Sequence, residues 1–111
     1  MKIVLLLSIS FLILGCSNIV KSGAIVEAQN AFDMSKYNEA IEHIDIAESF
    51  GELSEANTAK LQYLRAQSLE ALGRQSEAIP IYQYVVEQHP RSAYTISSQQ
   101  RLDALRILFK D

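Results

Sequence analysis

Few side chains in this 111-residue chain are of a type that performs nucleophilic or acid–base chemistry. There is one cysteine, Cys16, and the two histidines, His43 and His89, stand far apart in the sequence. A nucleophile needs a base beside it, and that base needs a partner that orients it. No such set can be recognised, and the chain has no glycine-rich phosphate-binding loop. We therefore predict that the protein is not an enzyme, has no catalytic residue and uses no cofactor.

The acidic stretch around His43 has the composition of a metal site. Glu39 and His43 stand four residues apart, so they share one face of a helix, with Glu42 and Asp45 close by. A closed metal site takes about four ligands, and two ligands on one face do not complete it. We predict a solvated helix face and no bound metal. His89 is predicted to cap the C-terminal end of a helix, where a positive tendency suits the helix dipole.

The position of Cys16 indicates another use for its thiol. It follows Gly15 and a run of twelve mostly apolar residues, 3–14, that is preceded by Lys2. Such a run is too short to cross a hydrocarbon core of roughly 30 Å as a helix, and it has the dimensions of a signal peptide. Residues 13–16 resemble a bacterial lipobox, which implies cleavage before Cys16 and attachment of lipid to it. The alternatives are an uncleaved membrane anchor and a plain secretory signal with an incidental cysteine.

Cleavage at this position divides the chain into a signal peptide, 1–15, a short lipid tether, 16–21, and one domain, 22–111. The mature chain then holds nine basic and thirteen acidic residues, a net charge of −4. This balance argues against nucleic acid as a partner, because binding to phosphates depends on clustered Lys and Arg. Residues 16–55 carry a net −6 and residues 56–111 a net +2. The asymmetry suits docking of another protein or of a second copy of this chain.

After Cys16 the chain is predicted to be all helical. Apolar residues recur at intervals of three and four, and no stretch alternates in the manner of a strand. Five helices are expected, at about residues 19 or 22 to 34, 37–50, 55–72, 76–88 and 92–109. Ser54 and Ser76 are the predicted N-caps, and Gly51 and Gly73 are placed to end helices.

Two pairs of these helices repeat with an offset of 38 residues. The matched pairs are Ala28 and Ala66, Ser35 and Gly73, Ala40 and Ala78, Ile44 and Tyr82, and Ala47 and Val85. The second unit, with its spaced alanine, glycine, tyrosine and final Pro90, resembles the consensus of the tetratricopeptide-repeat (TPR) family. The resemblance implies an all-α fold of two TPR-like units and a C-terminal capping helix. The rival interpretation is an unrelated pair of helical hairpins.

The last helix has two possible roles. Its inward residues are expected to be Tyr94, Leu102, Leu105 and Leu108 or Phe109. A terminal helix of this kind shields the last apolar face of a repeat array. Its apolar residues extend around more than one face, however, so docking of a partner or formation of a homo-oligomer stays open.

The TPR resemblance also implies a binding surface, since the first helix of each unit lines a concave groove in that family. Carried over by position, the groove residues are Ile25, Gln29, Phe32 and Asp33 from the first unit and Lys60, Tyr63, Gln67 and Glu70 from the second. Phe32 and Tyr63 would supply apolar contact, and the glutamines would hydrogen-bond an extended peptide. Phe32 is equally compatible with a place in the core.

These resemblances imply a function and a cellular location. Residues 89–94 are similar to linkers in envelope TPR proteins, which implies a non-catalytic adaptor for a protein or peptide in cell-envelope assembly. Ser17 after the lipidated cysteine implies the outer membrane, with the domain facing the periplasm. The alternatives are a pilotin-like chaperone for an outer-membrane subunit and a structural subunit docked through its C-terminal helix.

Overall fold

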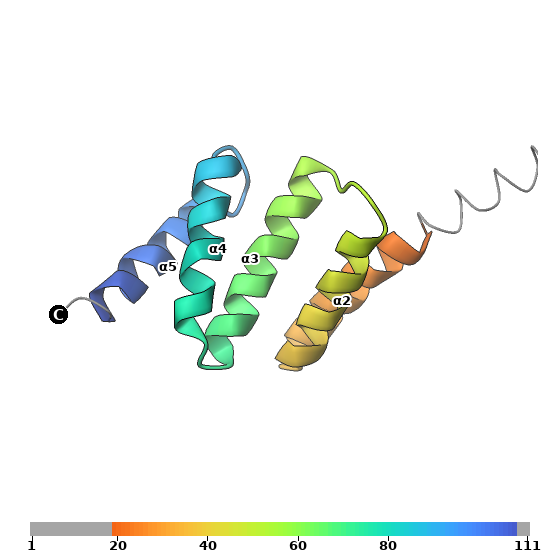
Figure 1. Ribbon diagram of the computed structural model, residues 1–111, viewed down its shortest axis with the longest axis horizontal. Coiled ribbons are helices and arrows are strands. Elements are labelled where there is room, and N and C mark those ends of the chain that lie inside the picture. Colours follow the sequence, from red (N-terminus) through yellow and green to blue (C-terminus); the bar gives the residue numbers. More distant parts are fainter. Residues whose placement is uncertain (1–18, 109–111) are drawn as a thin grey trace, which may run out of the picture.

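The protein is an array of helices, each packed against the next (Figure 1). The computed structural model describes residues 19–108, which form five helices and no strand. The first helix covers residues 19–33 of this range, and the others are α2 (Tyr37–Ser49), α3 (Glu55–Ala71), α4 (Gln75–Gln88) and α5 (Thr95–Leu108). The all-α prediction is confirmed. The predicted signal peptide, Cys16 and Phe109 lie outside the described residues.

Local signals account for most of the helix ends. Ser54 is the N-cap of α3, and its side chain accepts a hydrogen bond of 3.1 Å from the backbone N–H of Asn57, as predicted. Ser76 is not the N-cap of α4. That helix begins one residue earlier, at Gln75, after Arg74, whose side chain pairs with the Glu77 carboxylate in the first turn.

The helix α5 begins at Thr95, about three residues later than predicted. The turn before it is held by hydroxyl groups. Thr95 Oγ1 donates to the carbonyl of His89 at 2.6 Å, and Ser92 Oγ accepts from the N–H of Tyr94 at 3.2 Å. These bonds give the backbone an alternative to the first helical turn, which is the usual effect of Ser and Thr in such positions.

The turns that join the two helices within each repeat unit have the same hydrogen bonds. In the first, the N–H of Ser35 donates to the carbonyl of Phe32 and that of Lys36 to the carbonyl of Ala31, at 2.9 and 2.8 Å. The equivalent bonds 38 residues on, from Gly73 to Glu70 and from Arg74 to Leu69, measure 3.0 and 2.8 Å. Both are Schellman motifs with a left-handed residue, Ser35 at φ 60° and Gly73 at φ 78°. The 38-residue repeat predicted from the sequence is therefore present in the backbone.

Burial follows the same repeat. All members of four matched pairs are fully buried: Ala28 with Ala66, Ala40 with Ala78, Ile44 with Tyr82, and Ala47 with Val85. The core forms two clusters. One lies between the first helix, α2 and α3 around Ile44 and Leu61, and the other joins α3, α4 and α5 around Tyr82 and Leu102. α3 contributes to both clusters and so joins the two units.

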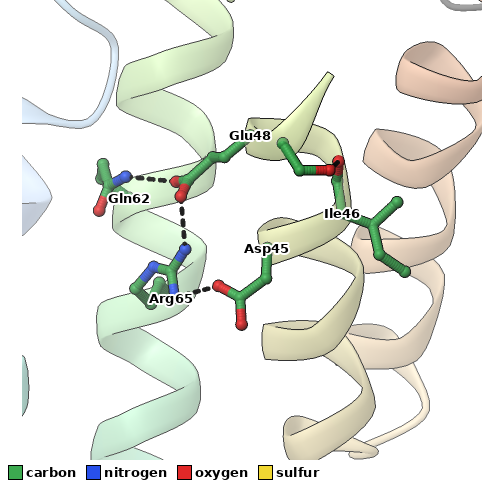
Figure 2. A network of polar contacts seen from close by, with 6 residues as sticks. Asp45, Ile46, Glu48, Gln62 and Arg65 are labelled. Carbon is green, nitrogen blue, oxygen red and sulfur yellow. Dashed lines mark hydrogen bonds and ion pairs between the residues drawn. The ribbon is translucent and has the colours of Figure 1, made fainter. Parts of the chain in front are cut away.

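A polar network reinforces the junction between α2 and α3 (Figure 2). The Arg65 guanidinium on α3 donates to Asp45 at 2.8 Å and to Glu48 at 2.9 Å, both on α2. Gln62 adds a bond of 2.7 Å to Glu48. Only 18% of the Arg65 side chain is exposed. Its positive charge is therefore largely removed from water and is compensated by these two carboxylates.

The inward face of α5 differs from the prediction at its end. Leu102 and Leu105 are buried as expected, together with Ser98, but Leu108 is 73% exposed. The last turn of α5 extends away from α4 (Figure 1), and no other described helix covers it. The expected inward residue was Leu108 or Phe109; Leu108 does not lie inward, and Phe109 lies outside the described residues. Helical spacing fixes which face a residue lies on but not how far the neighbouring helix reaches.

The two matched turns allow a paired test of backbone strain. Gly73→Ala should lower the free energy of unfolding by about 1 kcal/mol, because a Cβ disfavours the left-handed region. Ser35→Gly should raise it by roughly 0.5 kcal/mol, because relief of that strain exceeds the added flexibility of the unfolded chain. No atom lies within 4 Å of a Cβ built at Gly73, so a clash would not contribute. Urea unfolding followed by circular dichroism would measure the free energy of unfolding of both variants. Changes of the same sign would contradict the assignment of positions 35 and 73 as equivalent left-handed turn residues.

Candidate functional site

A surface cavity of about 200 Å³ lies where the two repeat units meet. It is lined by side chains from all parts of the array: Phe32, Tyr37, Gln67, Glu70, Ala71, Tyr82 and Arg101. Three of the residues predicted for the groove, Phe32, Gln67 and Glu70, are therefore brought together. Three aromatic rings, an amide and an ion pair give the cavity both apolar and polar walls.

Glu70 on α3 is the centre of the polar wall. Its carboxylate accepts two hydrogen bonds from Arg101, from Nε at 3.0 Å and from a terminal nitrogen at 2.5 Å. It also accepts one from the Tyr82 hydroxyl, at 3.1 Å. Only 22% of the Glu70 side chain is exposed, so three donors from α4 and α5 hold it in one position.

The electrostatics keep these donors protonated. Burial raises the pKa of Tyr82, and the neighbouring Glu70 carboxylate raises it further. The hydrogen bond to Glu70 raises the pKa of Arg101. Tyr82 therefore remains a neutral hydroxyl and Arg101 a cation throughout the physiological pH range. A tyrosine with its pKa shifted upward is not activated as a base or as a nucleophile.

Tyr63 was expected in the groove as an exposed apolar contact, but the structure surrounds it with other tyrosines. Its ring lies 5.1 Å from that of Tyr94 and 6.0 Å from that of Tyr82, measured between ring centroids. Its hydroxyl accepts a hydrogen bond of 3.1 Å from the Gln67 amide. Tyr63 packs against the second core cluster beside the cavity, so its removal would disturb α3, α4 and the turn before α5.

Phe32 combines the two roles that the sequence left open. It packs against the first core cluster, and its ring meets that of Tyr37 edge to face with centroids 5.6 Å apart. The same residue lines the cavity. Phe32 thus belongs to the margin of the core, with part of its surface available to a ligand.

The remaining predicted groove residues lie outside the cavity lining. Ile25 packs against the first core cluster. Gln29 donates to Asp33 at 2.9 Å on the surface of the first helix, and Lys60 is half-buried on α3. A ligand could contact these residues only if it extended beyond the cavity.

The cavity also contains two residues that were not predicted for the groove, Tyr82 and Arg101. Arg101 and Glu70 are 31 residues apart, and no local spacing relates them. The complementary charges on two amphipathic helices were the one available signal, and they did not indicate which residues pair.

The two histidines are placed apart. His89 is the C-cap of α4, as predicted, and it is buried with its ring against Tyr84 and Nδ1 3.5 Å from the Glu55 carboxylate. His43 is half-buried on α2. Among residues 19–108, no three His, Cys, Asp or Glu side chains are grouped so that they could hold a metal ion.

Comparison with protein-family models, with curated proteins and with solved structures finds no match. Within the described part of the chain, no helix combines the length and the apolar character needed to span a membrane.

The Glu70 cluster can be tested by its effect on stability. Glu70→Gln should lower the free energy of unfolding by about 1–2 kcal/mol, because it removes the charge from a half-buried carboxylate that accepts three hydrogen bonds. Glu87→Gln is the control, since Glu87 is exposed and accepts one bond from Gln83 on the same helix. The control should change stability by less than about 0.5 kcal/mol. Equal effects of the two substitutions in urea unfolding would refute the special position of Glu70.

Proposed function

We propose that this chain is a non-catalytic lipoprotein of the outer membrane that binds an extended segment of another envelope protein. The observation that carries the proposal is the cavity at the junction of two matched helical units, which gathers aromatic rings from both units and an amide from the second. Such sites suit recognition of peptide side chains at alternate positions.

The repeat geometry supports a TPR-like interpretation of the fold. Both units have the same turn between their two helices, and matched alanines lie buried at equivalent positions. The helix α5 covers the second core cluster with Leu102 and Leu105, as a capping helix would. These features motivate the assignment of two TPR-like units and a cap.

The cavity suggests the chemistry of the bound segment. Phe32 and Tyr37 would contact one apolar side chain of the ligand, while the buried Tyr82 supports the wall behind them. The Gln67 amide would then exchange its bond with Tyr63 for one with the peptide backbone. The charges of Glu70 and Arg101 neutralise each other, so we expect a segment that is not strongly charged.

Anchoring through Cys16 and the orientation toward the periplasm rest on the sequence. The short apolar run, the lipobox-like residues and Ser17 after the cysteine support this part of the proposal.

A second candidate is a structural subunit docked through α5. Ile107 and Leu108, each 73% exposed, favour it, because two adjacent exposed apolar residues at a helix end are suited to cover by a partner. A pilotin-like chaperone would use the same cavity as the adaptor but release its client.

Binding at the cavity can be tested with Gln67→Ala, which removes the amide without removing a core side chain. Crosslinking in membranes followed by affinity capture should recover the partner in reduced yield, by about tenfold for one lost hydrogen bond in a desolvated site. Gln83→Ala is the matched control, because Gln83 makes a similar bond within α4 and does not line the cavity. A partner lost only on Ile107→Ser with Leu108→Ser would favour the docked subunit instead.

Lipid attachment can be tested independently of binding. The chain expressed in a Gram-negative host should incorporate labelled palmitate and sediment with membranes. Cys16→Ser should abolish the label and leave residues 1–15 uncleaved. A wild-type chain with an intact thiol at Cys16 would refute the anchor and leave the cavity proposal standing.

A further inference from the structure

The end of the array formed by the first helix and α2 exposes several apolar side chains. Ile19, Val20 and Val26 on the first helix are 73, 45 and 57% exposed, and Ile46 and Phe50 on α2 are 41 and 40% exposed. We call these five residues the end patch. Monomeric proteins rarely leave such a group uncovered without a use for it.

A contact within the domain brings the start of the first helix close to the end of α2, the two segments that carry the end patch. The Lys21 ammonium donates to the backbone carbonyl of Glu52 at 2.8 Å, so the turn after Phe50 lies beside the start of the first helix. Figure 1 shows the loop between α2 and α3 at the same end as the first residues of that helix. Figure 2 shows Ile46 on the side of α2 opposite Arg65, away from the neighbouring α3.

The position of Cys16 determines what can cover this patch. Ile19 follows Cys16 by three residues, a span of no more than about 11 Å even when fully extended. The headgroup layer of one leaflet is only about 5–8 Å deep. A lipid held on Cys16 therefore keeps the start of the first helix at the membrane surface.

We infer that the end patch is a membrane-contact surface, with Ile19, Val20 and Phe50 inserted among the lipid headgroups; the inference rests on the proposed lipid anchor. The array then stands on the bilayer by its first unit, and α5 lies at the far end. This orientation leaves the cavity around Glu70 accessible to a partner from the side.

The charge around the patch indicates how it binds. The Lys21 ammonium is already bonded to the backbone carbonyl of Glu52, and the side chains of Glu52 and of Glu27 on the first helix are exposed. These residues give no attraction to anionic lipid, so apolar burial must supply the contact. Binding should therefore be insensitive to salt and to the fraction of anionic lipid.

The absence of tryptophan from the chain makes fluorescence a clean probe. Phe50→Trp places an indole in the patch, and Ile107→Trp places one on an exposed residue of α5 as the control. Each full-length acylated variant would be reconstituted in phosphatidylcholine vesicles whose acyl chains carry bromine. We expect loss of emission and a shift to shorter wavelength at position 50, neither changed by salt, and no loss at position 107. Ile46→Trp is a second probe should Phe50→Trp alter the circular dichroism spectrum.

Three results would overturn the inference. The first is tryptophan emission that bromine leaves unchanged at both position 50 and position 46. The second is an equal loss of emission at positions 50 and 107. The third is a blue shift at position 50 without bromine quenching, in a chain that sediments as a dimer. The last would mean that a second copy covers the patch. The intact mass of the chain, measured beforehand, separates the two proposals. A chain without acyl groups would overturn both the anchor and this inference, whereas an acylated chain that is not quenched would overturn the inference alone.

Discussion

The close approach of helices at buried alanines is the constraint on which the rest of this structure depends. Ala28, Ala40, Ala66 and Ala78 have no exposed surface, and they occupy matched positions in the two units. A larger side chain at such a position would push the helices apart, since interiors are packed almost as densely as crystals. Because the alanines let each pair of helices pack closely, Ile44 and Tyr82 can fill the spaces beside them.

Polar groups hold successive helices together at two places, one between the units and one within the second unit and the last helix. Arg65 joins α3 to α2 through two carboxylates, and Glu70 joins α3 to α4 and α5 through Tyr82 and Arg101. Arg65 faces two carboxylates, whereas Glu70 and Arg101 neutralise each other, so little net charge is left at the cavity. Recognition at the cavity would therefore depend on shape, on aromatic contact and on the Gln67 amide. This agrees with the proposal that the bound segment is not strongly charged.

Sequence reasoning succeeded where short-range interactions decide the structure. Ser54 caps α3 through a bond to a residue three positions on, and Gly73 ends that helix through the bonds of its own turn. It failed at Ser76, because the Arg74 side chain reaches Glu77 and the helix starts one residue earlier. The exposure of Leu108 could not be read from the spacing of α5, because that spacing does not indicate where α4 ceases to cover the helix.

The sequence by itself determined the five helices, the turn residues and the 38-residue repeat, since each depends on residues a few positions apart or on a pattern that recurs. Only the tertiary structure decided that Glu70 meets Arg101, that Tyr63 lies against Tyr94, and that Lys21 reaches Glu52. Both Lys21 with Glu52 and Glu70 with Arg101 are 31 residues apart. Such pairs meet only when the angles between successive helices are fixed, and those angles arise from the packing of all the buried side chains together.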